Sequence, residues 1–474
     1  MSYEQVSKDL EKVIGYIHSD ELTDDEKKLM TEQTLDYFDN YVSPGWLKYR
    51  KSVSTNSAVL EWKDHDGVCD GLYGEEFIDC LGGFGIYTCG HRNPEILDTV
   101  KAQLDHQALH SQELLDPLRG YLAKAVADIT PGDLQYCFFT NGGAEAVEMA
   151  LKLARIATGG RWYISTVGAF HGKSMGAISM GGKNTYRVPY TPMVQQVQHV
   201  EYGNAEDARK AIRNLIAVGE KVAAMIVEPI QGEAGVIVPP EGYLTELRQI
   251  CDEYGVALIF DEIQTGMGRT GTMWRCEAEG VTPDIMTFGK AFGGGIMPIT
   301  GIICKPSMWV QQLIDNPWLL GSPTFGGNPV CCSAAIATIK YMIDNDIPGQ
   351  CASKGKILKA GLESLKAKFN AEKKDFEAKI SALNTQFKDL VNLAKKGLKD
   401  YPLKMIDTFR IPVMGYYLYY SWVNEAFRLA LVQEIPKHEY NDLFNSGEMN
   451  QEAFKSLGYE LPDIEVKDNR KNLC

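Results

Sequence analysis

The sequence predicts an α/β protein whose larger domain contains a mostly parallel, doubly wound sheet. Short apolar segments alternate with helical stretches along the middle of the chain, as in proteins that wind helices around a parallel sheet. The clearest segment, Val256–Phe260, is a continuous apolar run, which is expected of a strand buried on both faces. Further segments of this kind lie at residues 136–139, 162–165, 222–227 and 285–288.

Length, charge and composition restrict the class of protein. A chain of 474 residues can bury a large core and form two or three lobes. The formal net charge of −14 and the pI near 5.2 argue against nucleic acid or an anionic membrane as a partner. The acidic first residues lack an apolar signal core, and no apolar stretch reaches the ~20 residues of a membrane span. We therefore expect a soluble, cytoplasmic protein.

The cysteines point to the same compartment. There are 11 of them, including the pair Cys331-Cys332, but no two have the CxxC spacing of a metal or redox motif. An odd number of scattered cysteines is typical of reduced thiols in a cytosolic enzyme. We expect neither a metal site nor a disulfide framework.

The chain divides into three predicted regions. Residues 1–75 are expected to form a helical arm followed by a small β-meander, because amphipathic helical periodicity gives way to short β-like runs such as Ala58–Trp62. Residues 76–348 contain the strand and helix alternation of the large domain. Residues 349–474 are expected to be mainly helical.

The helical prediction for the third region depends on a seven-residue spacing. Large apolar residues recur in a run rich in lysine, alanine, glutamate and leucine, and this spacing predicts a long helix with a continuous apolar seam. The residues of the seam are Leu362, Phe369, Phe376, Leu383 and Leu390. A surface helix packed on its own domain is favoured over an intermolecular coiled coil. The aromatic residues 416–422 have no assignment.

The strongest chemical signal comes from Asp261 and Lys290, which follow two of the predicted strands. Ligands bind at the carboxyl ends of strands in open α/β sheets, so we expect this carboxylate and this amine in one crevice. A buried lysine can hold an aldehyde such as pyridoxal phosphate, with a carboxylate against the pyridine nitrogen. Taken alone, the pair also fits an acid that caps a loop and a solvated surface lysine.

Two more loops fit parts of such a cofactor. Residues 140–145 join a strand to a helix, and backbone amides at a glycine-rich helix start bind phosphate. The same Asn-Gly-Gly sequence also fits a simple turn. Phe170 follows another strand, where its ring could lie on a planar group or fill a core position.

Six motifs in one order resemble the class III (omega-amino) aminotransferases, which are pyridoxal-phosphate enzymes of fold type I. They lie at residues 141–145, 169–172, 228–233, 261–266, 289–291 and 324–329. The resemblance covers roughly residues 37–348, and the tail departs from it. Shorter matches resemble family members that act on diamines, and they lie at residues 44–46, 49–52, 76–85 and 110–117.

The resemblance implies a role for each matching residue. Lys290 would hold pyridoxal 5'-phosphate covalently and later transfer a proton as a general acid and base. Asp261 would pair with the pyridine nitrogen, and Gln264 would bind on the side of the ring hydroxyl. Phe170 would stack on the ring, and His171 is counted with it among the cofactor-binding residues.

The resemblance also implies that two subunits hold the cofactor phosphate. Gly143 and Ala144 would donate backbone amides, and Thr324 would add its hydroxyl from across the interface of a homodimer. The family usually has a serine or threonine hydroxyl in this loop, where the chain has Gly142 and Ala144. Each missing hydrogen bond costs on the order of 1 kcal/mol, so the cofactor affinity is expected to be lowered.

The expected reaction is transfer of a terminal amino group, from putrescine or a related diamine, to an oxo acid such as 2-oxoglutarate. Gln112 and Glu233 are the candidates for binding the dicationic amine. The family's arginine for the acceptor carboxylate would lie in the divergent tail, where Arg410 is the candidate. The alternatives are an aminotransferase for ornithine, acetylornithine or 4-aminobutyrate, and a catalytically weakened scaffold protein with the same fold.

Overall fold

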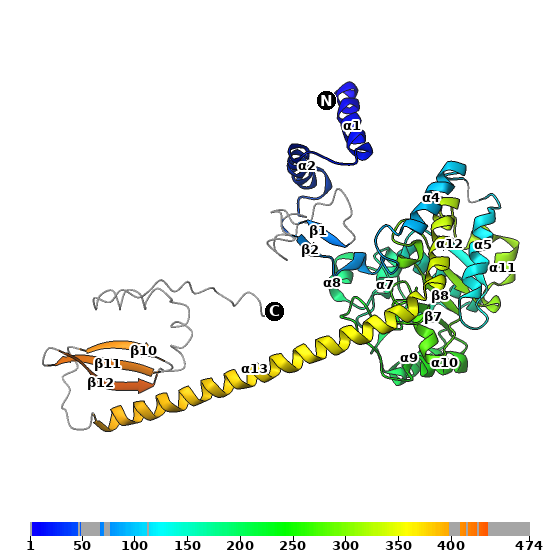
Figure 1. Cartoon of the computed structure of the whole chain (residues 1–474). Helices are drawn as coiled ribbons and strands as arrows, with labels where there is room; N and C mark the ends of the chain where they lie inside the picture. The colour runs from blue at the N-terminus through cyan, green and yellow to red at the C-terminus, as the bar shows by residue number, and fades with distance from the viewer. Residues whose placement is uncertain are drawn as a thin grey trace. The chain divides into compact units, whose positions relative to one another are not determined.

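The computed structural model divides the chain into two compact units, residues 1–358 and residues 359–474 (Figure 1). The structure describes residues 2–45, 48, 67–70, 76–110, 113–397, 408–413, 416–423 and 426–434. Two predictions lie outside the described residues. They are the strand at residues 58–62 and Gln112 as a substrate-binding residue.

The larger unit is built on a seven-stranded sheet with the order β3-β9-β8-β7-β6-β4-β5. Only β9 runs antiparallel to its neighbours in this sheet, and the other neighbouring pairs are parallel. The strands are β3 (Tyr136–Thr140), β4 (Trp162–Thr166), β5 (Val197–Val200), β6 (Val222–Val227), β7 (Ala257–Asp261), β8 (Ile285–Phe288) and β9 (Thr300–Cys304). This sheet confirms the predicted α/β fold and adds β5 and β9 to the predicted strands.

The central strands are apolar throughout because both faces of the sheet are covered. Every residue of β6 and β7 is buried. In β7, Leu258 and Phe260 pack into one core cluster, whereas Ala257 and Ile259 pack into the other. Successive side chains of a strand point to opposite faces, so a strand between two cores needs no polar positions.

The helices of the larger unit supply the two cores. Helices α4, α5, α9, α10 and α12 contribute to one core cluster, and α6 and α7 contribute to the other. The helices are α1 (Tyr3–His18), α2 (Asp24–Tyr37), α4 (Pro94–His106), α5 (Pro117–Asp128), α6 (Gly143–Thr158), α7 (Met175–Met180), α8 (Asn184–Arg187), α9 (Ala205–Ala217), α10 (Tyr243–Tyr254), α11 (Gln311–Asp315), α12 (Pro329–Asp344) and α13 (Ile347–Gly397). Among the described residues, none of these helices has the length and apolar character needed to cross a membrane.

Shorter helical turns join these elements. One of them begins at Lys290 and becomes part of the site described below. The turns are η1 (Phe38–Val42), η2 (Gly82–Phe84), η3 (Val188–Tyr190), η4 (Arg275–Glu279), η5 (Lys290–Gly293), η6 (Pro306–Met308) and η7 (Pro317–Leu319).

The chain segments before and after the large sheet domain each contain helices and strands. Near the N-terminus, α1 and α2 lie where amphipathic periodicity predicts helices, and β1 (Val68–Asp70) pairs antiparallel with β2 (Glu76–Ile78). The predicted long helix is α13, which has 51 residues. Its described seam residues Leu362, Phe369, Phe376 and Leu383 are exposed.

The smaller unit also contains a three-stranded antiparallel sheet, which the helical periodicity of the tail did not predict. Its order is β10-β11-β12. The strands are β10 (Thr408–Val413), β11 (Tyr416–Val423) and β12 (Ala426–Glu434). The aromatic residues without an assignment therefore form β11, in agreement with the preference of aromatic residues for strands.

Candidate active site

Asp261 and Lys290 lie at the same edge of the large sheet. Asp261 is the last residue of β7, and Lys290 begins η5, two residues after β8 ends. The two strands are parallel neighbours, and Asp261 stands opposite Thr287 in their register. The carboxyl ends of the strands therefore bring the predicted carboxylate and amine into one region, where open α/β sheets bind their ligands.

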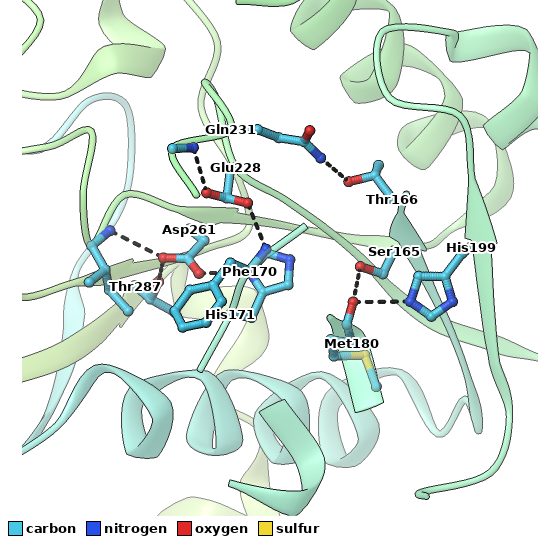
Figure 2. A network of polar contacts seen from close by, with 12 residues as sticks. Ser165, Thr166, Phe170, His171, Met180, His199, Glu228, Gln231, Asp261 and Thr287 are labelled. Atoms are coloured by element: carbon cyan, nitrogen blue, oxygen red, sulfur yellow. Dashed lines mark hydrogen bonds and ion pairs between the residues drawn. The ribbon is translucent and has the colours of Figure 1, made fainter. Parts of the chain in front are cut away.

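The carboxylate of Asp261 is buried and fixed by three hydrogen bonds (Figure 2). Its Oδ2 lies 2.7 Å from Nδ1 of His171. Its Oδ1 accepts a hydrogen bond of 3.0 Å from the hydroxyl of Thr287 and one of 3.2 Å from the backbone amide of Ile263. An ionised carboxylate has about four lone-pair positions, so this one keeps capacity for another donor.

His171 and Glu228 form the buried surroundings of this carboxylate. Burial by itself would lower the pKa of His171, but the hydrogen bond to Asp261 and the charges of Asp261 and Glu228 outweigh it, so the pKa is raised. The pKa of Glu228 is also raised, mainly by burial. Among the described residues, Nε2 of His171 is buried without a hydrogen-bond partner. The histidine therefore supports the negative charge of Asp261 from inside the protein.

Lys290 has an unusual backbone and a perturbed amine. Its φ of 45° lies in the left-handed region, which residues with a side chain rarely adopt and which occurs preferentially at functional sites. Burial lowers the pKa of Lys290, and the charges of Asp261, Glu228 and Glu233 oppose that shift. A lowered pKa leaves more of the amine in the neutral form, which is the nucleophilic one.

The first turn of α6 faces the same region. The carboxylate of Glu145 accepts hydrogen bonds from the amides of Asn141 and Gly142, at 2.8 and 3.3 Å, and thereby caps the helix. A Cβ added at Gly143 would lie 3.0 Å from the side chain of Ile263, two residues after Asp261. The amides of the first turn have no partners within the helix, and the helix dipole is positive there, so this turn suits an anion.

Gly172 explains how the start of α6 and the loop that carries Phe170 approach each other. Its φ is +122°, and a Cβ at this position would come within 2.6 Å of the Cβ of Ala144. Only glycine fits such a backbone and such a close contact. The loop after β4 is therefore held directly against the start of α6.

Phe170 and Gln264 also border this region. The backbone amide of Phe170 donates a 2.9 Å hydrogen bond to Glu228, and its half-buried ring meets the ring of Tyr186 edge to face, with centroids 5.8 Å apart. The side-chain amide of Gln264 donates a 2.9 Å hydrogen bond to the carbonyl of Phe84. Phe84 belongs to the glycine-rich segment after β2, which is thereby tied to the loop after β7.

Glu233 lies on the loop after β6, next to a tyrosine and a lysine. The hydroxyl of Tyr186 donates a 2.9 Å hydrogen bond to Oε1 of Glu233. Nζ of Lys183 lies 3.9 Å from the same oxygen and donates a hydrogen bond to the backbone carbonyl of Glu233. Glu233, a predicted substrate-binding residue, is therefore part of a polar cluster at the carboxyl ends of β4 and β6.

The other predicted site residues are Thr324, Arg410 and Gln112. Thr324 is exposed in the single chain, in the loop before α12. Arg410 lies on β10 of the smaller unit, where its register partner is Tyr419. Gln112 lies outside the described residues.

Several residues of the site have roles that the sequence did not predict. Thr287 has no motif of its own, although its position three residues before Lys290 on a buried strand could have indicated it. Glu228 begins the motif at residues 228–233 but received no role of its own. Lys183 and Tyr186 lie in a stretch without motifs, and only the folded chain brings them to Glu233.

With this geometry established, comparison with known proteins shows that the chain belongs to the class III aminotransferases. The family description Aminotransferase class-III matches residues 52–375. A putrescine aminotransferase from Pectobacterium atrosepticum is 47% identical over 365 residues, which cover 76% of this chain and 78% of that protein.

Solved structures agree with this family. A taurine:2-oxoglutarate aminotransferase from Bifidobacterium kashiwanohense, solved with PLP and glutamate, aligns with a TM-score of 0.65 and 28% identity over 74% of this chain and 80% of its own. An (S)-enantioselective omega-transaminase from Thermomicrobium roseum aligns with a TM-score of 0.65 and 25% identity over 71% of this chain and 80% of its own. The chain is thus a pyridoxal-phosphate-dependent aminotransferase of fold type I.

The residues present fit this cofactor. An aldehyde needs an amine of lowered pKa, and burial lowers the pKa of Lys290. A protonated ring nitrogen needs a buried carboxylate with spare acceptor capacity, as Asp261 has. A phosphate needs unpaired amides at a helix start, which the first turn of α6 supplies.

Proposed function

We propose that this aminotransferase takes the terminal amino group of putrescine or a related diamine and passes it to an oxo acid such as 2-oxoglutarate. The observation that supports this most is the 47% identity to a putrescine aminotransferase over 76% of the chain. Glu233, a carboxylate whose charge opposes the lowering of the Lys290 pKa by burial, supports it as well. A diamine carries a second ammonium group, which needs an acceptor of this kind at its far end.

Within this proposal, each side chain of the site has a task. When bound, the cofactor supplies an electron sink for the carbon that carries the transferred amine. Asp261, backed by His171 and Thr287, would keep the ring nitrogen protonated. Nζ of Lys290 would hold the cofactor and move the proton at that carbon, as a base whose pKa burial has lowered. Phe170 would cover the ring and exclude water from one face.

The first turn of α6 would hold the phosphate through the amides of Gly143 and Ala144. Thr324 would complete the phosphate site from the other subunit of a homodimer, and its exposure in the single chain fits such a role. Gln264 would bind on the side of the ring hydroxyl and Gln112 on the side of the substrate. The acidic, cytosolic character expected from the sequence fits an enzyme that acts on small molecules in the cytoplasm.

A donor comparison tests the substrate. Rates of the cofactor-loaded enzyme with 2-oxoglutarate are measured for putrescine, cadaverine, ornithine, acetylornithine and 4-aminobutyrate. We expect the highest kcat/KM for one of the two diamines, because neither carries a carboxylate that the charge of Glu233 would repel. A clear preference for any of the three carboxylated donors would overturn the diamine assignment. A protein that takes up no cofactor would instead support the scaffold alternative.

A further inference from the structure

One face of α13, the long helix of Figure 1, is apolar and exposed within the smaller unit. It consists of Leu362, Leu365, Phe369, Phe376, Ile380 and Leu383, whose side chains are 46% to 68% exposed. At about 3.6 residues per turn, these positions fall within about 60° around the helix axis. A helix in water gains most of its stability by burying such a face. The apolar face of α13 therefore needs a surface that covers it.

The apolar face is symmetric about its own middle. Counting outward from the bond between residues 372 and 373, its members occupy the fourth, eighth and eleventh positions on both sides. Phe369 corresponds to Phe376, Leu365 to Ile380, and Leu362 to Leu383. The spacing of the face is therefore the same when the helix is read in either direction.

This symmetry suits a pair of identical helices that run in opposite directions. In an antiparallel pair with two-fold symmetry, each residue lies level with the residue at the same distance on the other side of the centre. Every member of the apolar face then meets an apolar residue of the second helix. Within each half, neighbouring members are three or four positions apart, as in helices that pack knobs into holes. The face therefore complements a second copy of itself.

The centre of the face is polar and carries both signs. Glu372 and Lys373 occupy it, so an antiparallel pair brings two acids and two bases to the same layer. Nζ of Lys373 lies 4.0 Å from Oε1 of Glu377, one turn further along the helix. A polar residue inside a coiled coil costs some stability but fixes the register of the two helices. The centre therefore favours the one register in which the apolar residues also match.

The edges of the apolar face add further charge pairs. On one edge, the antiparallel arrangement brings Lys366 nearly level with Glu377 of the partner subunit, and the two-fold symmetry repeats this pair. On the other edge, Nζ of Lys379 lies 2.7 Å from Oδ2 of Asp375 in the same helix. A second copy of α13 therefore matches this face in charge as well as in apolar spacing.

We propose that the apolar face of α13 binds α13 of a second copy of this chain, in an antiparallel coiled coil centred between residues 372 and 373. The pairing needs neither substrate nor cofactor, so it goes beyond the proposed reaction. It is also separate from the interface expected around Thr324, because Thr324 belongs to the larger unit and the apolar face to the smaller one. The tail of this chain thereby supplies a second means of association.

Cross-linking of the full-length chain tests this pairing. Two differently tagged chains are co-expressed, one with Leu365→Cys and one with Ile380→Cys, and are treated with a short bifunctional thiol reagent. Each chain carries one introduced cysteine, so a link between these positions joins two chains. We expect peptide mass spectrometry to find the link between positions 365 and 380. The control pair Ala367→Cys and Ala378→Cys is also level but lies on the outer faces, about 20 Å apart, and should link at least about tenfold less.

A second pair of positions leaves every apolar residue in place. Lys366→Cys and Glu377→Cys should also link, and adding Phe369→Glu to both chains should reduce this link about tenfold, because it buries a charge. Adding Ala371→Glu on the outer face should change it less than about twofold. A link between two chains that both carry Leu365→Cys would show parallel pairing. That result, or linking no greater than in the outer-face control, would overturn the proposal.

Discussion

At the scale of single residues, Ala144 stands in the loop where the resemblance implies a serine or threonine hydroxyl. A side-chain hydroxyl is missing where the phosphate is expected, so Ala144→Ser should add one hydrogen bond. We expect the apparent dissociation constant of pyridoxal phosphate to fall about fivefold, corresponding to about 1 kcal/mol. Equilibrium titration of the cofactor-free protein measures this change.

A matched control is available on the same helix. Ala157→Ser makes the same chemical change on α6, far from its first turn, and should leave the affinity within about twofold. Equal effects of the two substitutions would show that the loop does not hold the phosphate. Because Gly172 lies close to the Cβ of Ala144, the hydroxyl of the Ala144→Ser variant must point away from the loop that carries Phe170.

The buried pair of His171 and Asp261 predicts a dependence of stability on pH. The native pKa of His171 is raised above its unfolded value, so its contribution is complete below the unfolded pKa of ~6.5 and disappears as the pH rises through the native value. We therefore compare the free energy of unfolding of cofactor-free wild type and His171→Gln. The difference should be largest in acid and shrink above neutral pH. A difference that grows toward alkaline pH would contradict this account of the pair.

At the scale of elements, the cap of α12 supports the loop that carries Thr324. Asn328 is buried, its side chain accepts a hydrogen bond of 2.9 Å from the amide of Cys331, and it donates one of 2.7 Å to the carbonyl of Phe325. Asn328→Ala should lower the free energy of unfolding by about 1–2 kcal/mol in denaturant titrations. Asn345→Ala, at the exposed other end of α12, should cost less than about 0.5 kcal/mol. Similar costs at both ends would argue against the cap.

The elements also show what the sequence could predict. Continuous apolar runs predicted β6, β7 and β8. Strands buried on both faces are apolar throughout, so their sequences do not show a spacing of polar and apolar residues that resembles a helix. The seven-residue spacing predicted α13 because helical periodicity is local. The antiparallel strand β9 was missed, since its pairing with β3 and β8 depends on contacts distant in sequence.

In the candidate site, too, local patterns were predictable and contacts distant in sequence were not. Asp261 and Lys290 were predictable because each follows a recognisable strand, and the topology of parallel neighbours brings them together. The contact of His171 with Asp261 and that of Tyr186 with Glu233 join loops that are far apart in the chain. No local pattern encodes such contacts, so Thr287, Glu228 and Lys183 received no role until the fold was known.

At the scale of the whole molecule, the expected homodimer predicts complementation between variants. If Thr324 of the partner subunit completes each phosphate site, a Lys290→Ala chain paired with a Thr324→Ala chain contains one fully native site. Mixed dimers should therefore bind cofactor with wild-type affinity at one site per dimer, whereas Thr324→Ala alone should bind it more weakly. Mass measurement by analytical ultracentrifugation checks the dimer. Failure of the mixed dimers to regain a tight site would place Thr324 in its own subunit's site or in none.

The central claim is that Lys290 holds the cofactor against Asp261 at the edge of the sheet. Borohydride treatment of the cofactor-loaded enzyme, followed by peptide mass spectrometry, tests it most directly because reduction makes the covalent link permanent. The account predicts that the cofactor is found on the peptide that contains Lys290 and that Lys290→Ala shows neither the label nor turnover. A label on another lysine, or unchanged turnover in Lys290→Ala, would contradict it.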